Sequence, residues 1–382
     1  MRGPAADRVN VPGSRVKPVI VAGHVCLDLT PAFTAPPSIA PGRLIAAGPL
    51  ALSPGGCVGN TGPALAALGV PTQLVADVGS DDLGRVLVAL LATSNADTTG
   101  IARLDGRGTS YSIVVDVPGR DRTFWHHIGA NAAFDGSGVV ERIEGEARRG
   151  GPGTILHVGY STHLPALYAD GGTALVRLVT AVRAAGATVS LDMAEIDPAS
   201  EAAAVDWDVV LSGALPSVDV MKASVDDLAA MLPKRAGLEP VAWADALVEL
   251  GAAVALVTAG ADGLYVRTAG AARIAGAGRP LRDAVSDWAD RELWMPSFAT
   301  RRLATTGAGD AAAAGVVAGL ADGRGPAGSA ALSAAAAAAR MAGRPIGEAF
   351  EIEKAVEPAG EGRPGWSLGP ERAYRGPRDG RV

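Results

Sequence analysis

A glycine-containing stretch near the carboxyl end of the chain, Thr305-Thr306-Gly307-Ala308-Gly309-Asp310, has the residue types of a phosphate-handling site. Gly307 and Gly309 allow positive φ and let the backbone approach a ligand closely. The apolar run 311–320 predicts a helix directly behind them. Because the first N–H groups of a helix lack internal partners and lie at its positive end, this turn predicts an anion site.

Asp310 places a carboxylate beside the predicted anion site. Its charge would repel a phosphate, so its chemistry fits better a general base that removes a proton from an attacking hydroxyl. The alternative is a plain loop in which Asp310 caps a helix. A four-residue motif alone favours this simpler interpretation, because short motifs often match by chance.

Composition sets the class of protein. Of 382 residues, 48% are hydrophobic and 19% are charged, which is enough for a large buried core. The net charge of −6 and the lack of a basic stripe exclude a nucleic-acid partner. No apolar run approaches the ~20 residues of a membrane span, and there are only two cysteines, so we expect a cytoplasmic protein with no membrane partner. Residues 1–16 and 357–382 are rich in Pro, Gly and Arg and are expected to be disordered.

Short β-branched runs alternate with helical segments, which predicts an α/β fold with a mostly parallel sheet. Strands are expected at 19–23, 72–78, 154–158, 188–192, 209–211 and 254–258, and helices at 62–69, up to about 91, at 172–185, 311–320 and 329–341. Residues 269–295 have mixed character and resemble an insertion.

A predicted hairpin interrupts this alternation. Residues 109–117 and 122–128 have strand character on either side of a turn at 118–121, and the Pro-rich region 31–50 is expected to leave the core. His126 and His127 lie on the hairpin, but adjacent strand residues face opposite sides, which argues against a shared metal ion. No other His, Cys or carboxylate grouping has metal-ligand spacing.

Polar residues follow several predicted strands. Asp28 comes after the first strand, where open α/β sheets bind ligands, although a turn or capping role is equally consistent. Asn60 ends a glycine-dense turn at 53–60 and offers both a donor and an acceptor. Ser224 predicts a helix N-cap with Asp227 three residues later. Capping explains that spacing fully, and a magnesium-water ligand is the functional alternative for Asp227.

Together these motifs resemble the ribokinase, or PfkB, family of carbohydrate and nucleoside kinases over most of residues 17–345. The motifs occur in this order: Asp28; Gly55-Gly56 with Asn60; Val78-Gly79 with Asp81 and Gly84; Gly129-Ala130-Asn131-Ala132; Lys222 with Ser224 and Asp227; Thr258 with Gly260 and Gly263; and Thr306-Gly307-Ala308-Gly309-Asp310. Each motif alone is weak, whereas seven in order are a strong signal.

The resemblance implies a three-layer αβα ribokinase-like fold over residues 17–356, with a mostly parallel central sheet. It also implies a small β lid from about 28–54 and 108–130, which closes over a sugar and pairs in a homodimer. The implied activity is phosphorylation of a small sugar with ATP and Mg²⁺.

The resemblance also assigns roles to residues. The catalytic set is Asp310 as the base, with Gly307, Ala308 and Gly309 as the anion hole. The sugar-binding set is Asp28, Gly55, Gly56, Asn60 and Asn131. The nucleotide-binding set is Lys222, Ser224, Thr258, Gly260, Gly263 and Thr306, with Asp227 as the metal ligand.

The sequence departs from the family pattern at three places, one of which is the Ala run 334–339, where the Asn often found near adenine is missing. Ala304 stands where the family usually has an Asp that helps bind a monovalent cation, so potassium activation stays open. Ser224 and Asp227 replace the usual Asn and Glu of the magnesium motif. A nucleoside kinase of the same fold and a non-catalytic sugar- or nucleotide-binding relative are therefore kept as alternatives. A Rossmann dehydrogenase is excluded, because no G-x-G-x-x-G follows the first strand.

Overall fold

A large sheet runs through the centre of the computed structural model, which describes residues 16–37, 40–117, 122–148, 153–298 and 306–355. Its strands follow the order β13-β12-β11-β10-β9-β8-β1-β4-β5, and all neighbours are parallel except at β12, which is antiparallel to both β11 and β13. The strands are β1 (Val19–Gly23), β4 (Thr72–Gly79), β5 (Asp97–Leu104), β8 (Ile155–Gly159), β9 (Thr188–Asp192), β10 (Val220–Ser224), β11 (Val254–Thr258), β12 (Leu264–Thr268) and β13 (Glu292–Met295).

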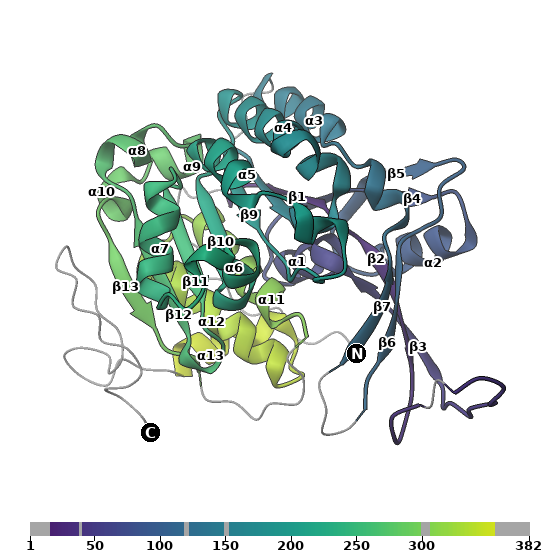
Figure 1. Ribbon diagram of the computed structural model, residues 1–382. Helices are drawn as coiled ribbons and strands as arrows, with labels where there is room; N and C mark the ends of the chain where they lie inside the picture. Colours follow the sequence, from purple (N-terminus) through teal and green to yellow (C-terminus); the bar gives the residue numbers. More distant parts are fainter. Residues whose placement is uncertain (1–15, 38–39, 118–121, 149–152, 299–305, 356–382) are drawn as a thin grey trace.

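Helices cover both faces of this sheet (Figure 1). One layer consists of α1 (Gly56–Ala67), α2 (Asp82–Leu91), α8 (Ala271–Ala275), α9 (Arg279–Arg282), α10 (Val285–Trp288), α11 (Ala308–Ala321), α12 (Pro326–Met341) and α13 (Ala349–Ala355). The other consists of α3 (Ser137–Arg148), α4 (Pro165–Ala184), α5 (Trp207–Ala214), α6 (Val225–Met231) and α7 (Pro240–Glu249). Alternate residues of β1 enter the two cores, Val19 and Val21 on one side and Ile20 and Ala22 on the other. This explains why the strand reads as a continuous apolar run.

A second, smaller sheet projects from the three layers (Figure 1). It is made of β2 (Cys26–Pro31), β3 (Leu50–Gly55), β6 (Tyr111–Val115) and β7 (Thr123–His127) in the order β3-β2-β6-β7. Strand β2 pairs in parallel with β6, and the other two pairs are antiparallel. Because β2 follows β1 almost directly and β3 leads into α1, the small sheet is attached to the body next to the first strand of the large sheet.

The expected fold is confirmed, with local differences. Residues 209–211, expected as a strand, lie in α5, because the Asp206 side chain accepts the Val209 N–H at 3.3 Å and caps a helix there. A three-residue apolar run cannot distinguish the two structures. Helix α1 begins at Gly56 rather than near 62, so Asn60 is helical and Pro63 lies inside the helix. Burial of Cys57, Val58 and Leu65 outweighs the low helix propensity of the glycines.

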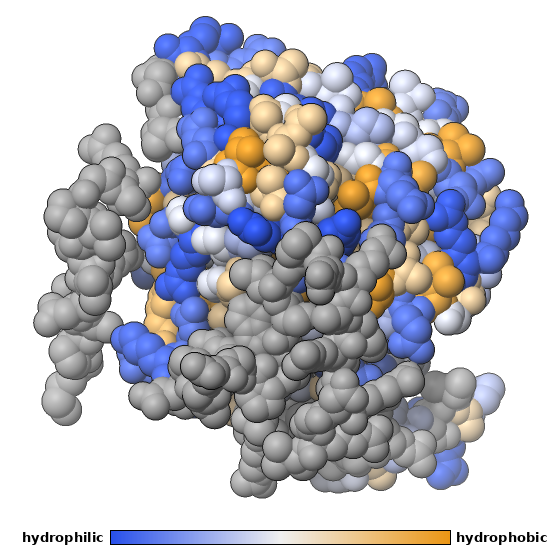
Figure 2. All heavy atoms as spheres, turned by 90° about the vertical axis from the view of Figure 1, so that its left-hand side faces the viewer, coloured by the Kyte–Doolittle hydropathy of each residue, from blue (hydrophilic) through white to orange (hydrophobic). Residues whose placement is uncertain are grey.

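The expected hairpin is present as β6 and β7, while its turn at 118–121 lies outside the described residues, as do 1–15, 304–305 and 357–382. Hydrophilic residues predominate on the face beside β13, with isolated hydrophobic ones between them (Figure 2). In the described part of the chain, no helix combines the length and apolar character needed to cross a bilayer.

Candidate active site

Polar residues, some of them predicted from the sequence, meet where the parallel strands of the large sheet end. Asp192 is the last residue of β9, Lys222 lies near the end of β10, and Tyr160 directly follows β8. All three surround the first turn of α11, which carries Asp310. This is the edge at which open α/β sheets bind their ligands.

The glycine turn forms the start of α11 as the sequence predicts. Gly307 is the N-cap residue with φ of 78°, a left-handed conformation that favours glycine. The guanidinium of Arg340, on α12, lies against this turn and donates from Nε to the Thr306 carbonyl at 3.0 Å. A Cβ on Gly307 would lie 2.9 Å from the same Nε, so a larger residue there would require the arginine to shift.

Lys222 supplies a buried positive charge at the same turn. A Cβ on Gly309 would lie 3.1 Å from its Nζ, which places the ammonium beside the helix start. The ammonium pairs with the Asp192 carboxylate at 2.9 Å, and both side chains are almost fully buried. The turn therefore combines unpaired helix N–H groups with a lysine and an arginine, which together suit a polyanion such as a nucleotide phosphate chain.

The Asp310 carboxylate is held by three side-chain donors. Its Oδ2 accepts from the Tyr160 hydroxyl at 2.8 Å and from Asn60 Nδ2 at 3.1 Å. Its Oδ1 accepts from the Thr61 hydroxyl at 3.1 Å. Asn60 and Thr61 both belong to α1, which begins at Gly56 and not near residue 62 as the sequence predicted. This early part of α1 therefore holds two of the three donors to the carboxylate.

The electrostatic setting of Asp310 suits a proton acceptor. Burial raises the pKa of Asp310 above its ordinary value, although the Tyr160 hydroxyl and the Lys222 ammonium oppose that rise. A buried carboxylate with a raised pKa is a better base than an exposed one.

The lysine and its partner respond to the same burial. Burial would lower the pKa of Lys222, but its carboxylate neighbours, Asp192 first among them, outweigh it and hold that pKa above its usual value. Burial raises the pKa of Asp192 to about 7 against the attraction of the ammonium. The lysine therefore stays charged at neutral pH beside the turn.

Tyr160 is a site residue that sequence reasoning missed. Its backbone is left-handed, with φ of 61° and ψ of 46°, which is rare for a bulky residue. Strained positions of this kind cluster at functional sites. The available signal was its place directly after the predicted strand 154–158, the same position that drew attention to Asp28.

Asp28 and Asn60 line a cleft of about 340 Å³ that opens next to the glycine turn. The cleft is also lined by Thr306, Arg340, and Phe124 from the small sheet. Asp28 lies within β2 rather than in a turn, and burial raises its pKa. A Cβ on Gly55 would come within 2.5 Å of the Asp28 carboxylate, so glycine is needed there for the carboxylate to fit.

Asn131 has a positioning role in this structure. Its side chain is fully buried, accepts the Val25 N–H at 3.2 Å and donates to the Val25 carbonyl at 2.8 Å. It thus fixes the segment that joins β1 to β2, rather than facing the cleft.

The predicted nucleotide-side residues are present on neighbouring strands. Ser224 caps α6, and the Asp227 carboxylate accepts the Ser224 N–H at 2.9 Å, so the capping interpretation is confirmed. Thr258 pairs with Ser224 across β10 and β11. Gly260 borders open space, whereas a Cβ on Gly263 would come within 2.2 Å of the Met295 carbonyl, so close packing explains that glycine.

The structure brings together three histidines that have no metal-ligand spacing in the sequence. His24, His126 and His163 each place one ring nitrogen within 4.8 Å of the others. Burial lowers the pKa of all three rings, that of His126 to about 4, so they are neutral at pH 7. Sequence spacing could not reveal this group, because His24 and His126 lie 102 residues apart. The ring of His24 also stacks on that of Tyr160, at 5.9 Å between centroids.

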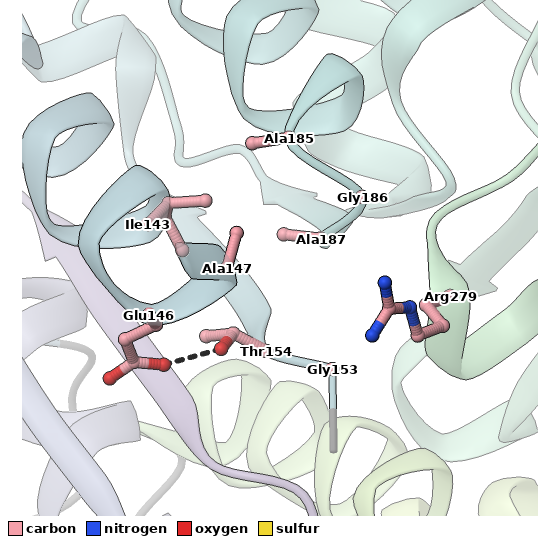
Figure 3. Close-up of a pocket in the computed structure, with 9 residues that line it drawn as sticks. All are labelled: Ile143, Glu146, Ala147, Gly153, Thr154, Ala185, Gly186, Ala187 and Arg279. Atoms are coloured by element: carbon pink, nitrogen blue, oxygen red, sulfur yellow. Dashed lines mark hydrogen bonds between the residues drawn. The ribbon is translucent and has the colours of Figure 1, made fainter. Parts of the chain in front are cut away.

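A second, small cavity lies at the opposite end of the parallel strands (Figure 3). Thr154 directly precedes β8 and Ala187 directly precedes β9, so this cavity sits at the amino ends of the strands. The Thr154 hydroxyl donates a hydrogen bond to the Glu146 carboxylate beside it (Figure 3). None of the residues predicted for catalysis lines it.

Solved structures with the same architecture are ribokinases and related kinases. A ribokinase from Arabidopsis thaliana, complexed with ribose and ATP, has a TM-score of 0.67 at 18% identity and covers 89% of this chain and 99% of its own. Phosphofructokinase-2 from Escherichia coli, in a tetrameric inhibited form, has a TM-score of 0.66 at 19% identity, covering 89% and 99%. A putative ribokinase II from E. coli, in complex with ATP and Mg²⁺, has a TM-score of 0.65 at 20% identity, covering 88% and 98%. No curated protein matches the sequence.

The large sheet between two helical layers and the small second sheet are the ribokinase fold. The family model for pfkB family carbohydrate kinases matches residues 17–344. The chain therefore belongs to the pfkB family and is a carbohydrate kinase.

Proposed function

We propose that this protein transfers the γ-phosphoryl group of ATP to a hydroxyl group of a small sugar. The observation that supports this most directly is the buried Asp310 carboxylate, which lies in the first turn of α11 beside the Gly309 backbone and the Lys222 ammonium. A proton acceptor is thereby placed next to an anion site, as phosphoryl transfer to an alcohol requires.

Asp310 acts as the general base in this proposal. A carboxylate has about four acceptor positions, and the three donors to Asp310 use both on Oδ2 and one on Oδ1. Oδ1 therefore keeps one lone pair for the sugar hydroxyl. The hydroxyl oxygen forms the new bond to phosphorus, its proton moves to Oδ1, and the bond to ADP breaks. Asp28 and Asn60, which both line the cleft next to the glycine turn, hold the sugar hydroxyls. Gly55 and Gly56 let the backbone pass close to these hydroxyls.

The residues around the turn fit ATP. The N–H groups of the Gly307-Ala308-Gly309 turn, with Thr306, Lys222 and Arg340, offer donors and positive charge to the phosphates. Ser224, Thr258, Gly260 and Gly263 would lie on the nucleotide side, and the Asp227 carboxylate would hold Mg²⁺. A bound Mg²⁺ would neutralise charge on the transferred group, and the positions of this chain's residues would supply the rest of the catalysis.

The test is ADP release from Mg-ATP over a panel of free sugars, sugar phosphates and nucleosides, with and without potassium. ADP release that depends on one sugar class supports the proposal and names the substrate. Release without any acceptor dependence, or ligand-dependent thermal stabilisation without release, contradicts it. Because Ala304 lacks the carboxylate expected for a monovalent-cation site, we expect little difference between the potassium arms.

A nucleoside is the second candidate acceptor. Phe124 lines the cleft, and its side chain is 46% exposed, so its ring is available to stack on a base. The nucleoside arm of the same panel separates the two substrate classes.

We also propose that two copies pair through the small sheet. Its outer strands β3 and β7 carry exposed apolar side chains, namely Leu50, Leu52, Phe124 and Trp125. Unpaired edge strands with such side chains need cover. Light scattering of the intact chain and of Leu52→Glu should show a dimer and a monomer, respectively, and a monomeric wild type contradicts the proposal.

A further inference from the structure

Three histidines from distant parts of the chain meet where the small sheet joins the large one. His24 directly follows β1, His126 lies on β7, and His163 ends the short 3₁₀ turn after β8, Ser161–His163. The ring centroids are 5.1, 5.2 and 5.8 Å apart, and one nitrogen of each ring lies within 4.8 Å of the others.

The nitrogen positions approach those of a tetrahedral metal site. Nε2 of His24 and Nε2 of His126 are 3.3 Å apart. Two nitrogens bound at about 2.05 Å to a tetrahedral zinc ion lie about 3.4 Å apart. Since the third nitrogen is within 4.8 Å of both, its ring closes by up to about 1.4 Å when an ion binds.

Hydrogen bonds on the outer side of the rings orient them for this role. His163 Nε2 is 2.9 Å from the Glu195 carbonyl, which can only accept, so Nε2 carries the proton and Nδ1 keeps its lone pair. His126 Nδ1 is 3.0 Å from the Ser112 hydroxyl, which leaves its Nε2 facing His24. Metal-bound histidines usually have such a partner on the second ring nitrogen.

His24 is the least satisfied of the three rings. It is 3% exposed, and its Nδ1 has no hydrogen-bond partner among the described residues. Among the described residues, its one side-chain hydrogen-bond contact is the Nε2–Nε2 approach to His126, where a single proton must serve two ring nitrogens. An ion shared by the rings would satisfy both nitrogens at once.

We propose that His24, His126 and His163 bind one zinc ion whose fourth position is open. Three neutral imidazoles with a free fourth position are an established zinc ligand set, and His126 lies at the surface, where the ion can enter. The ion would tie β7, the outer strand of the small sheet, to the carboxyl ends of β1 and β8.

The test is a calorimetric titration of chelator-treated, tag-free protein with zinc chloride. The zinc content of the protein is then measured after gel filtration. His126→Ala is the test variant, and His127→Ala is a matched control, because His127 is adjacent on β7 and instead contacts the Tyr111 ring. We expect one zinc ion per chain in wild type and His127→Ala. In His126→Ala the dissociation constant for zinc should be at least 100-fold larger.

A thermal melt supplies a second readout, because an ion that binds only the folded state raises the melting temperature. Zinc should raise it in wild type and His127→Ala, but not in His126→Ala or His163→Ala. Metal-free melts establish that each variant is folded. Zinc binding that is absent in the wild type, or unchanged in His126→Ala, overturns the proposal and leaves a hydrogen-bonded histidine cluster without metal.

Discussion

Replacing Asp310 with Asn tests the assignment of the base with little change in shape. With its amide oxygen toward Tyr160 and Asn60, the asparagine would direct Nδ2 at the Thr61 hydroxyl, which can accept. All the present partners are therefore retained, and the acceptor site keeps its form. What is lost is the lone pair that takes the proton.

The expected loss follows from the work assigned to Asp310. A positioned general base contributes about 10²–10⁴ in rate, or about 3–5 kcal/mol of transition-state stabilisation. We expect kcat to fall by that factor in a coupled ADP assay, with the KM values for sugar and ATP changed by less than about threefold. Asp322→Asn is the matched control, because Asp322 is the C-cap residue of the same helix and is half exposed. Its kcat should equal that of the wild type.

Asp310→Asn should lower kcat but raise the stability of the fold. Burial raises the pKa of Asp310 in the folded state, so its ionised form destabilises the fold at every pH above that pKa. An asparagine removes this cost, and Asp310→Asn should melt at a higher temperature than the wild type at pH 7.5. A kcat for Asp310→Asn within tenfold of the wild-type value would refute the assignment, whatever the melting temperature.

Three further substitutions probe the surroundings. Tyr160→Phe removes a hydroxyl that lowers the pKa of Asp310, so the acid limb of the kcat/KM profile should move to higher pH, and an unshifted limb contradicts this role. Gly309→Ala adds a Cβ 3.1 Å from Lys222 Nζ and should raise the KM for ATP about tenfold or more, whereas an unchanged KM would place the phosphates elsewhere. Asp77 is half-buried in β4, and its pKa is raised to about 6. Above pH 6, Asp77→Asn should therefore increase the free energy of unfolding, measured with urea, by about 1–2 kcal/mol after allowance for its partial exposure. That gain should vanish below about pH 4, where the wild-type carboxyl is protonated in both the folded and unfolded states, and a gain that persists there contradicts the electrostatic cause.

Much of the fold could be predicted from the sequence, because local patterns carry it. The apolar run at 19–23 becomes β1 with the same bounds, since a buried parallel strand must be apolar on both faces. The spacing of Ser224 and Asp227 predicts a capping box, which forms between neighbouring residues and needs no tertiary partner. The left-handed conformation at the start of α11 occurs at Gly307, a residue type that permits it without strain.

Local patterns failed where tertiary packing decides the outcome. The early start of α1 depends on burying Cys57 and Val58 against the sheet, which outweighs the glycines around them. The run 209–211 satisfies both strand and helix patterns, and the Asp206 cap decides for the helix.

The sequence by itself determined the family resemblance, the proposed base and the turn beside it, because these are short motifs whose order along the chain is visible. Only the tertiary structure decided which residues meet them. The Tyr160 hydroxyl reaches Asp310 across 150 residues, and His24 reaches His126 across 102. Such contacts leave no periodic or local trace, because they are made by the packing of strands whose order in the sheet differs from their order in the chain.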